Sequence, residues 1–328
     1  MGTSQIPTEP FRHRYGLRGG HLQTIASFLL TRKIDLPPAE ERLIEVDPGI
    51  RVLCDCNWQP ERSQAMTLLM VHGLEGSSDS GYMLGTAHKA LAAGMNVVRM
   101  NQRNCGGTDH LAPTLYNSGL SHDVGRVAQA LVESEQLTRF ALSGFSMGGN
   151  LVLKLAGEWG RNHPPQLKGV AVVCPAMDLA ASADALHRTS NRLYEQHFLI
   201  KLCQRLRRKA ELFPGQFDAS RARGIGSLRD FDDRVTAYYC GFAGAADYYD
   251  RAAASRVVDR IAVPTFLLYA KDDPFVRILP ESRAKVLANP NITFVETEHG
   301  GHCSFLAPAD GYDGRWAERQ VVAFVRQL

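Results

Sequence analysis

The sequence predicts an α/β fold, in which an open, mostly parallel β-sheet carries helices on both faces. Short apolar runs that are typical of buried strands alternate with longer stretches of helical periodicity along most of the chain. The chain has 328 residues, of which 45% are hydrophobic, enough to fill the core of such a sheet. On sheets of this kind, ligands bind beyond the carboxyl ends of the strands.

The expected strands and helices alternate from residue 67 to the end of the chain. Strands are expected at Thr67–Val71, Asn96–Met100, Phe140–Ser143, Val170–Cys174, Thr265–Tyr269 and Ile292–Val295. Helices are expected at Ser80–Ala93, Ser121–Glu135, Met147–Trp159 and Trp316–Gln327. The helices carry ordinary boundary signals, such as a serine cap at Ser121 and a terminating glycine at Gly94.

Residues 1–40 are expected to be irregular, because a glycine pair and a proline pair interrupt any regular pattern there. The polar segment Met1–Pro10 lacks the pattern of a signal peptide. The apolar stretch Ile25–Leu30 is too short to span a bilayer, so no integral membrane segment is expected. We expect this stretch to pack in the core or to contact a lid, with contact with a lipid surface as the alternative.

The alternation of expected strands and helices is interrupted again from about Met177 to Arg256. This segment is mostly helical in pattern, is rich in arginine and aromatic residues, and stands where a further strand would be expected. We interpret it as a helical cap inserted over the site, with ordinary peripheral helices as the alternative. The chain then divides into an N-terminal part of the core (1–176), the cap (177–256) and a C-terminal part of the core (257–328).

Charge and cysteine content narrow the class of protein. Lys and Arg number 37 against 34 Asp and Glu, and the net charge of +3 is too small to indicate nucleic-acid binding. The basic run Arg205–Lys209 is interpreted as the solvated side of a helix. The seven cysteines match no disulfide framework, which favours mostly buried, reduced thiols and a cytoplasmic protein.

The segment Gly144-Phe-Ser146-Met-Gly148 lies between an expected strand and an expected helix. This Gly-x-Ser-x-Gly pattern is that of the nucleophile turn of the α/β-hydrolase fold. The chain reverses sharply there and strains the serine backbone, so the residues two positions away must lack a Cβ atom. The hydroxyl of Ser146 would then stand at the start of a helix, where unpaired N–H groups favour negative charge. A plain glycine-rich turn is the alternative.

A serine hydroxyl becomes a good nucleophile when a histidine, steadied by a carboxylate, accepts its proton. In this fold the chain order is Ser, then Asp or Glu, then His. The loop after the penultimate expected strand offers Asp273, which we prefer, and Asp272 as the alternative. After the last expected strand, His302 follows two glycines that allow close approach to Ser146, and His299 is the alternative.

Acyl transfer also needs N–H donors for the oxygen that becomes negatively charged. The backbone N–H of Met147, directly after the serine, is expected to be one donor. The second is expected in the loop after the strand Thr67–Val71, where we nominate the N–H of Leu74. His72 in the same loop is expected to brace the loop.

Five motifs carry a family resemblance: Gly20-His-Leu-Gln-Thr24, His72-Gly-Leu-Glu-Gly-Ser-Ser78, Asn101-Gln-Arg-Asn-Cys-Gly-Gly107, Thr114-Leu-Tyr116 with Gly119, and Gly144-Phe-Ser-Met-Gly-Gly-Asn150. Together they resemble the AB hydrolase 4 family, which includes bacterial YheT-like hydrolases and eukaryotic α/β-hydrolase-domain lipases. The resemblance implies a triad of Ser146, Asp273 and His302, hydrolysis of carboxylic esters, and no metal or other cofactor. Asn104 departs from the Arg-Gly-Cys that many members carry.

The leading hypothesis is therefore a serine esterase or lipase-like hydrolase that acts on a small-molecule or lipid ester. A thioesterase or an acyltransferase would use the same residues. A non-catalytic binding protein on a hydrolase scaffold is the alternative of another class, although such proteins usually lack a triad member. The acyl length, the head group and the oligomeric state are left open by the sequence.

Overall fold

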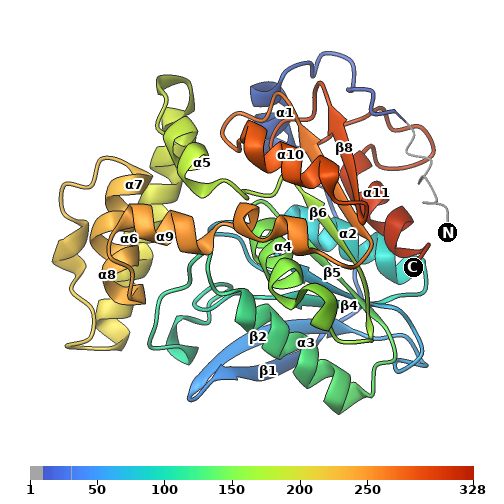
Figure 1. Cartoon of the computed structure of the whole chain (residues 1–328), viewed down its shortest axis with the longest axis horizontal. Coiled ribbons are helices and arrows are strands. Elements are labelled where there is room, and N and C mark those ends of the chain that lie inside the picture. Colours follow the sequence, from blue (N-terminus) through green and yellow to red (C-terminus); the bar gives the residue numbers. More distant parts are fainter. Residues whose placement is uncertain (1–9, 31) are drawn as a thin grey trace.

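The computed structural model describes residues 10–30 and 32–328, so the expectation for Met1–Pro10 lies almost wholly outside the described residues. Within these ranges, eight strands form one sheet in the order β1-β2-β4-β3-β5-β6-β7-β8. The pairs β1–β2 and β2–β4 are antiparallel. The other neighbours are parallel. The predicted α/β fold with a mostly parallel sheet is confirmed (Figure 1).

The elements agree with the predicted ones to within a few residues wherever a prediction was made. The strands are β1 (Glu40–Asp47), β2 (Ile50–Asn57), β3 (Thr67–Val71), β4 (Asn96–Met100), β5 (Phe140–Phe145), β6 (Leu167–Val173), β7 (Thr265–Ala270) and β8 (Ile292–Thr297). The α-helices are α1 (Gly20–Leu29), α2 (Gly81–Ala92), α3 (Ser121–Glu135), α4 (Met147–Trp159), α5 (Leu179–Leu186), α6 (Arg192–Leu212), α7 (Leu228–Phe231), α8 (Ala237–Cys240), α9 (Ala245–Ala252), α10 (Pro280–Ala288) and α11 (Trp316–Val325).

The core lies on both faces of the sheet, because successive side chains of a strand point to opposite sides. Leu69 and Val71 of β3 belong to the hydrophobic cluster that includes the inner residues of α3 and α4. Leu68 and Met70 of the same strand belong to the cluster that includes α2 and α11. The central strands are therefore buried on both sides, which explains why they appear in the sequence as continuous apolar runs.

The N-terminal region is more regular than predicted. The expectation that residues 1–40 are irregular is wrong for Gly20–Leu29, which forms α1, and strands β1 and β2 are not among the expected strands. Core packing of Ile25–Leu30 is wrong as well, since Phe28 is 75% exposed. The ring of Phe28 instead lies 6.2 Å from that of His197 on α6, so this stretch contacts the helical segment described next.

Helices α5 to α9 lie between β6 and β7 in the chain and gather beyond one edge of the sheet (Figure 1, left). Their apolar residues form a third hydrophobic cluster, in which Leu199, Leu202 and Leu206 of α6 meet Met147 from the start of α4. This segment therefore packs directly over the turn that carries Ser146. Among the helices of the described ranges, none is long and apolar enough to cross a bilayer.

The basic run on α6 is not a solvated face throughout, so that interpretation is wrong for Arg205 and Lys209. The ammonium of Lys209 is fully buried and donates to Asn104 Oδ1 (3.0 Å) and to the carbonyl of Asp109 (2.9 Å). These oxygens replace water around the charge, which makes its burial tolerable. Arg208 on the outer side is 60% exposed, as predicted for the run.

Candidate active site

The loops that follow β3, β5, β7 and β8 meet at the carboxyl edge of the sheet. β3 pairs directly with β5, so the loop with Leu74 adjoins the turn with Ser146. β7 pairs with β8, so the loop with Asp273 adjoins the loop with His302. Residues far apart in the chain are thereby brought to one edge, as expected for an open parallel sheet.

Ser146 occupies a strained turn between β5 and α4. Its backbone has φ 54° and ψ −119°, a conformation that L-residues rarely adopt. A Cβ atom at Gly144 would lie 2.3 Å from the carbonyl oxygen of Gly148, and one at Gly148 would lie 2.3 Å from that of Val71. Both positions therefore require glycine, for the steric reason inferred from the sequence.

The imidazole of His302 is oriented by Asp273. Its Nδ1 lies 2.8 Å from Asp273 Oδ2, and because an ionised carboxylate can only accept, Nδ1 is the donor. Asp273 Oδ1 accepts from the N–H groups of Phe275 (3.1 Å) and Val276 (2.9 Å). With Asp273 buried and fully hydrogen-bonded, the Nε2 atom of His302 is left as the free proton acceptor.

The two alternatives from the sequence, Asp272 and His299, form a second pair. Asp272 Oδ2 lies 3.1 Å from His299 Nδ1, and Asp272 Oδ1 accepts from the N–H of Gly301 at 2.9 Å. The remaining nitrogen of His299 accepts from Arg18 Nε at 3.3 Å. Both ring nitrogens of His299 are thus engaged, and Asp272 holds the loop that carries His302.

Ser146 and the loop that carries His302 meet at the carbonyl of Val173. The N–H of Ser146 and the thiol of Cys303 both donate to the carbonyl of Val173, at 3.0 and 3.4 Å. Within the described residues there is no hydrogen bond between Ser146 Oγ and His302 Nε2, and Nε2 contacts Cys303 Sγ at 4.0 Å. In ligand-free sites such catalytic bonds are often long and tighten when substrate binds.

The charge balance around His302 favours its protonated form. Burial opposes the imidazolium, but the Asp273 carboxylate and the Cys303 thiol outweigh burial and raise the pKa of His302 well above its ordinary value. Burial likewise opposes ionisation of Cys303, yet the hydrogen bond from Cys174 and the positive charge on His302 lower the pKa of Cys303 to about 6. Each of these two neighbours therefore favours the charged form of the other, and the Asp273 carboxylate further stabilises the positive ring.

The two predicted oxyanion donors border the same cavity as Ser146. Leu74, Met147 and Ser146 all line it, and a Cβ atom at Gly73 would lie 3.1 Å from that of Ser146. Across the described ranges, neither the N–H of Leu74 nor that of Met147 has an acceptor within the protein. Both donors are therefore available to a ligand beside the serine hydroxyl.

Glu75 holds the loop of Leu74 in place, a role that was not predicted from the sequence. Its backbone has φ 54°, and its N–H donates to the hydroxyl of Tyr116 at 3.1 Å. Arg205 of α6 binds both oxygens of the Glu75 carboxylate, Nε to Oε1 at 3.0 Å and Nη2 to Oε2 at 2.9 Å. The hydroxyl of Tyr116 also donates to Oε1 at 2.6 Å. A bidentate ion pair therefore joins α6 to the loop that carries the N–H of Leu74.

His72 braces the same loop, as predicted. Its Nδ1 lies 2.8 Å from the carbonyl of Gly73, and its Nε2 accepts from the N–H of Gln102 at 3.2 Å. Burial lowers the pKa of His72 to about 4. The ring therefore stays neutral and fills a structural position under the loop.

The departure at Asn104 has a structural explanation. Asn104 has φ 68°, in the left-handed region where glycine is favoured and asparagine is tolerated. Its amide nitrogen donates to the carbonyl of Thr114 at 2.8 Å, and its amide oxygen accepts from Lys209. The asparagine side chain therefore supplies the acceptor that the buried Lys209 needs.

Helix α1 also holds the loop of His302 in place. The N–H of His302 donates to the hydroxyl of Thr24 at 2.9 Å. A Cβ atom at Gly20 would lie 1.7 Å from the carbonyl oxygen of Asp272, so the helix touches the Asp272–Asp273 loop as well. Gln23 is buried and exchanges hydrogen bonds with the backbone of Leu306. Helix α1 is therefore part of the site, although its only signal in the sequence was the Gly20–Thr24 motif.

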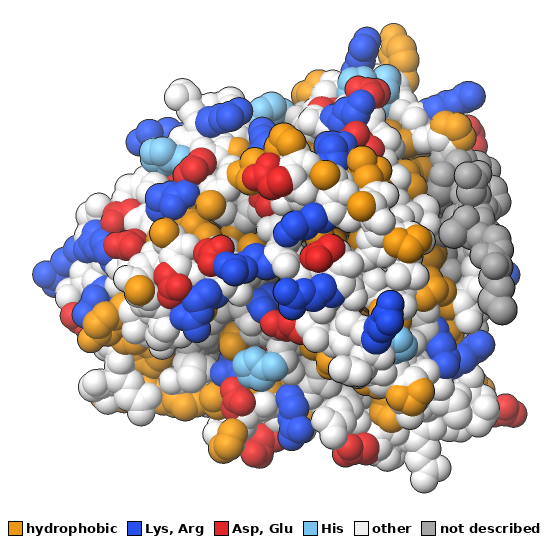
Figure 2. Space-filling view, viewed as in Figure 1, with side chains coloured by type: hydrophobic (Ala, Val, Ile, Leu, Met, Phe, Trp, Pro, Cys, Tyr) orange, Lys and Arg blue, Asp and Glu red, His pale blue; other side chains and the backbone are white. Residues whose placement is uncertain are grey.

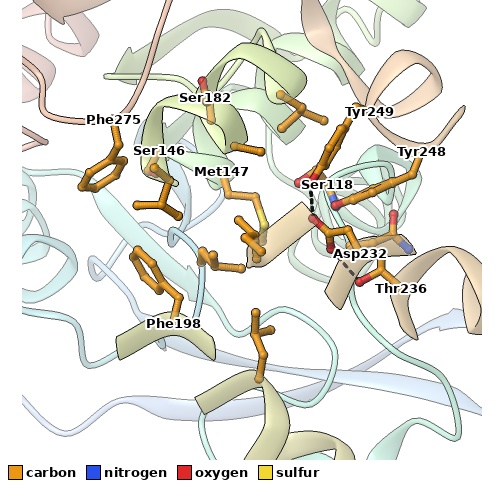
Figure 3. A pocket seen from close by; sticks show the side chains of 18 of the residues that line it. Ser118, Ser146, Met147, Ser182, Phe198, Asp232, Thr236, Tyr248, Tyr249 and Phe275 are labelled. Carbon is orange, nitrogen blue, oxygen red and sulfur yellow. Dashed lines mark hydrogen bonds between the residues drawn. The ribbon is translucent and has the colours of Figure 1, made fainter. Parts of the chain in front are cut away.

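The cavity beside Ser146 has an apolar end and a polar end (Figure 3). Phe198 and Phe275 line it near Ser146, and the ring of Phe275 lies 4.3 Å from that of His302. At the other end, Asp232 accepts from Tyr249 and from Thr236, each at 2.7 Å. Burial raises the pKa of Asp232 to about 6.

The sequence has relatives among hydrolases. A model described as the alpha/beta hydrolase family matches residues 68–313. The chain is 31% identical to "Putative esterase YheT" of Escherichia coli (strain K12), over 93% of this chain and 90% of that protein. It is 29% identical to "Phospholipase ABHD3" of Mus musculus, over 87% of this chain and 70% of that protein.

Solved structures share the fold at low sequence identity. The 2,6-dihydroxy-pseudo-oxynicotine hydrolase superposes with a TM-score of 0.58 at 17% identity, covering 94% of this chain and 71% of that one. The Pyrococcus furiosus esterase Pf2001 superposes with a TM-score of 0.55 at 15% identity, covering 90% and 97%. At these identities the likeness concerns the fold alone.

Proposed function

The chain belongs to the alpha/beta hydrolase family, and from this premise we propose that it hydrolyses carboxylic esters through an acyl-enzyme on Ser146. The family resemblance inferred from the motifs is confirmed by these matches. The observation that carries the proposal is the 2.8 Å contact between His302 Nδ1 and buried Asp273, at the sheet edge where Ser146 occupies its strained turn. The names of the relatives, an esterase and a phospholipase, support ester cleavage as the reaction.

In the proposed mechanism, His302 Nε2 takes the proton of Ser146 as the hydroxyl attacks the ester carbonyl. Asp273 keeps the ring in the correct tautomer and stabilises the imidazolium. The N–H groups of Leu74 and Met147 bind the negatively charged oxygen, and each such donor contributes about 3 kcal/mol to the transition state. The imidazolium then protonates the leaving alcohol. Water, activated by the same nitrogen, releases the acid from Ser146.

We further propose that residues 177–256 act as a cap that selects the substrate. The cavity walls next to Ser146 include Leu202 and Phe198 from α6, and the polar end includes Asp232 and Tyr249 from later in the same segment. An acyl chain fits the apolar end, and a head group with hydrogen-bond donors fits the Asp232 end. Small-molecule and lipid esters are both compatible with this arrangement.

The experiment that tests the proposal compares the native protein with Ser146→Ala on p-nitrophenyl esters of increasing chain length. Loss of about 10⁴-fold or more in kcat is expected, with the thermal midpoint unchanged. Ser134→Ala, at an exposed serine on α3, is the matched control and should retain turnover. A fluorophosphonate probe should label the native protein and leave Ser146→Ala unlabelled. Turnover that survives in Ser146→Ala would refute the proposal, and release of free acid distinguishes hydrolysis from acyl transfer.

A further inference from the structure

Cys174, His302 and Cys303 bring three metal-ligating side chains together beside the candidate nucleophile. One ligand atom from each lies within 4.8 Å of the other two. The contact between Cys303 Sγ and His302 Nε2 is 4.0 Å. In a tetrahedral zinc site, Zn–S distances of about 2.3 Å place two sulfur ligands about 3.8 Å apart. Small side-chain movements would therefore bring these atoms to the spacing of a zinc site.

The backbone already holds both thiols at this point. Cys174 follows β6 with φ 45°, and Cys303 has φ 55°, so each non-glycine residue is in the left-handed region. The thiol of Cys174 faces the carbonyl of Gly301 at 3.7 Å, and that of Cys303 faces the carbonyl of Val173 at 3.4 Å. Unfavourable backbone conformations of this kind persist where the surrounding structure fixes them, and they cluster at functional sites.

The histidine is also prepared as a ligand. In the neutral ring, His302 donates its Nδ1 proton to Asp273, and the lone pair on Nε2 is directed away from the carboxylate. Metal-binding histidines characteristically donate their other nitrogen to a carboxylate in this way. Two thiolates and one neutral imidazole carry two negative charges, which a divalent cation neutralises, as a buried site requires.

We propose that a thiophilic divalent cation, with Zn²⁺ as the typical case, binds Cys174, His302 and Cys303 and inhibits the enzyme. On binding, the Cys174 thiol releases one proton and the Cys303–His302 pair releases one proton to solvent, two metal–sulfur bonds and one metal–nitrogen bond form, and water occupies the fourth position. No electrons are transferred. The inhibition rests on the proposed function, because the metal occupies the Nε2 lone pair that accepts the proton of Ser146. The binding does not rest on it.

A second cluster, Asp47, His122 and Asp123, has comparable spacing but a different environment. Arg103 donates to Asp47 and to Asp123, each at 2.5 Å, and it is almost fully buried between them. The guanidinium already bonds both carboxylates and cancels one of their two negative charges, so this cluster offers a divalent cation less charge than two free carboxylates would. No arginine or lysine is hydrogen-bonded to the cysteine–histidine cluster within the described part of the chain.

Metal binding is tested directly on the Ser146→Ala protein, whose thiols and histidine are intact. Titration with Cd²⁺ should produce the ultraviolet absorption of cadmium–thiolate bonds and saturate at one equivalent. Adding Cys174→Ser or Cys303→Ser to this background should reduce the absorption change by about half or more. Cys203→Ser, at a partly buried thiol on α6, is the control and should leave the titration unchanged. Titration that depends on Cys203, or that survives loss of both other thiols, would overturn the site.

Inhibition is tested on the active protein with Zn²⁺ and, as a hard-cation control, Mg²⁺. Zn²⁺ should abolish turnover, and addition of a chelator should restore it. Mg²⁺ should have no effect. For half-inhibition relative to its own metal-free rate, Cys303→Ser should need at least 10-fold more Zn²⁺ than the native protein. Cys174→Ala, with a native thermal midpoint as its control, should show the same increase. If these variants were as sensitive to Zn²⁺ as the native protein, the proposed inhibition through this site would be refuted. Should the native protein lack esterase activity, the cadmium titration still decides the binding.

Discussion

The carboxylate of Asp273 accepts the Nδ1 proton of His302 across 2.8 Å, next to a second aspartate–histidine pair on the same two loops. The imidazole of His302 lies against Phe275, which lines the cavity beside Ser146. The imidazole of His299 is instead held by Asp272 and Arg18. The two pairs therefore differ: both ring nitrogens of His299 are hydrogen-bonded, whereas Nε2 of His302 has only the 4.0 Å contact with Cys303 among the described residues.

Substituting each aspartate by asparagine separates the two pairs. Asp273→Asn should lower kcat about 10⁴-fold, because the amide no longer holds the required tautomer of His302. Asp272→Asn keeps the oxygen that accepts from Gly301 and should cost less than about 10-fold. Initial rates on a p-nitrophenyl ester, with thermal midpoints measured alongside, decide between them. A larger loss in Asp272→Asn would transfer the role of orienting carboxylate to that residue.

The raised pKa of His302 predicts that activity is lost on acidification at a higher pH than for an ordinary histidine. Only the neutral ring can accept the proton of Ser146, and a raised pKa keeps the ring protonated to higher pH. The value of kcat/KM should therefore fall as the pH drops through this pKa, with its midpoint above about 6.5. In Cys303→Ser the midpoint should move down, because a negative neighbour is lost. The profile is measured with chelator present, and a native midpoint below that of the variant would contradict the expectation.

Arg205→Ala should lower kcat about 10-fold or more with little change in KM. The substitution leaves the Glu75 carboxylate without its bidentate partner, so the N–H of Leu74 loses its fixed direction. Arg205→Lys should recover only part of the rate, because an ammonium cannot bind both oxygens in the same geometry. Arg207→Ala, at an exposed neighbour on α6, serves as the control. A change confined to KM would show that Arg205 acts on substrate binding and not on the donor loop.

Gly148→Ala should destabilise the protein by at least about 2 kcal/mol, because the new Cβ meets backbone that cannot move aside. It would lie 2.3 Å from the carbonyl oxygen of Val71 in the central strand β3. Gly81→Ala is the matched control, since a Cβ there meets nothing within 4 Å at the start of α2. Urea denaturation monitored by circular dichroism gives both values. Equal stability of the two variants would mean that the turn relaxes without cost.

The central strands and the loops after them were predictable because burial on both faces leaves an unbroken apolar signal. The run Thr67–Val71, for example, coincides with β3. The turn at Ser146 was predictable for a different reason, since glycines at fixed spacing record a steric requirement. Because both signals are local, a single sequence is enough to detect them.

The missed features depend on contacts between distant parts of the chain. Strand β1 mixes charged and apolar residues and is only partly buried, so its signal is weak. The apolar residues of α1 are largely exposed, which is the reverse of what hydrophobicity predicts. The charges of Arg205 and Lys209 predict exposure to solvent. Their burial depends on the partners Glu75 and Asn104, which lie more than 100 residues away in the chain.

Helix α1 lies outside the segment 68–313 by which the family is recognised. A shortened protein limited to that segment would retain Ser146, Asp273 and His302, yet the loop of His302 would lack the hydroxyl of Thr24 beneath it. The segment 68–313 is therefore smaller than the part of the chain that builds the candidate site. Truncation for expression or crystallisation should begin upstream of Gly20.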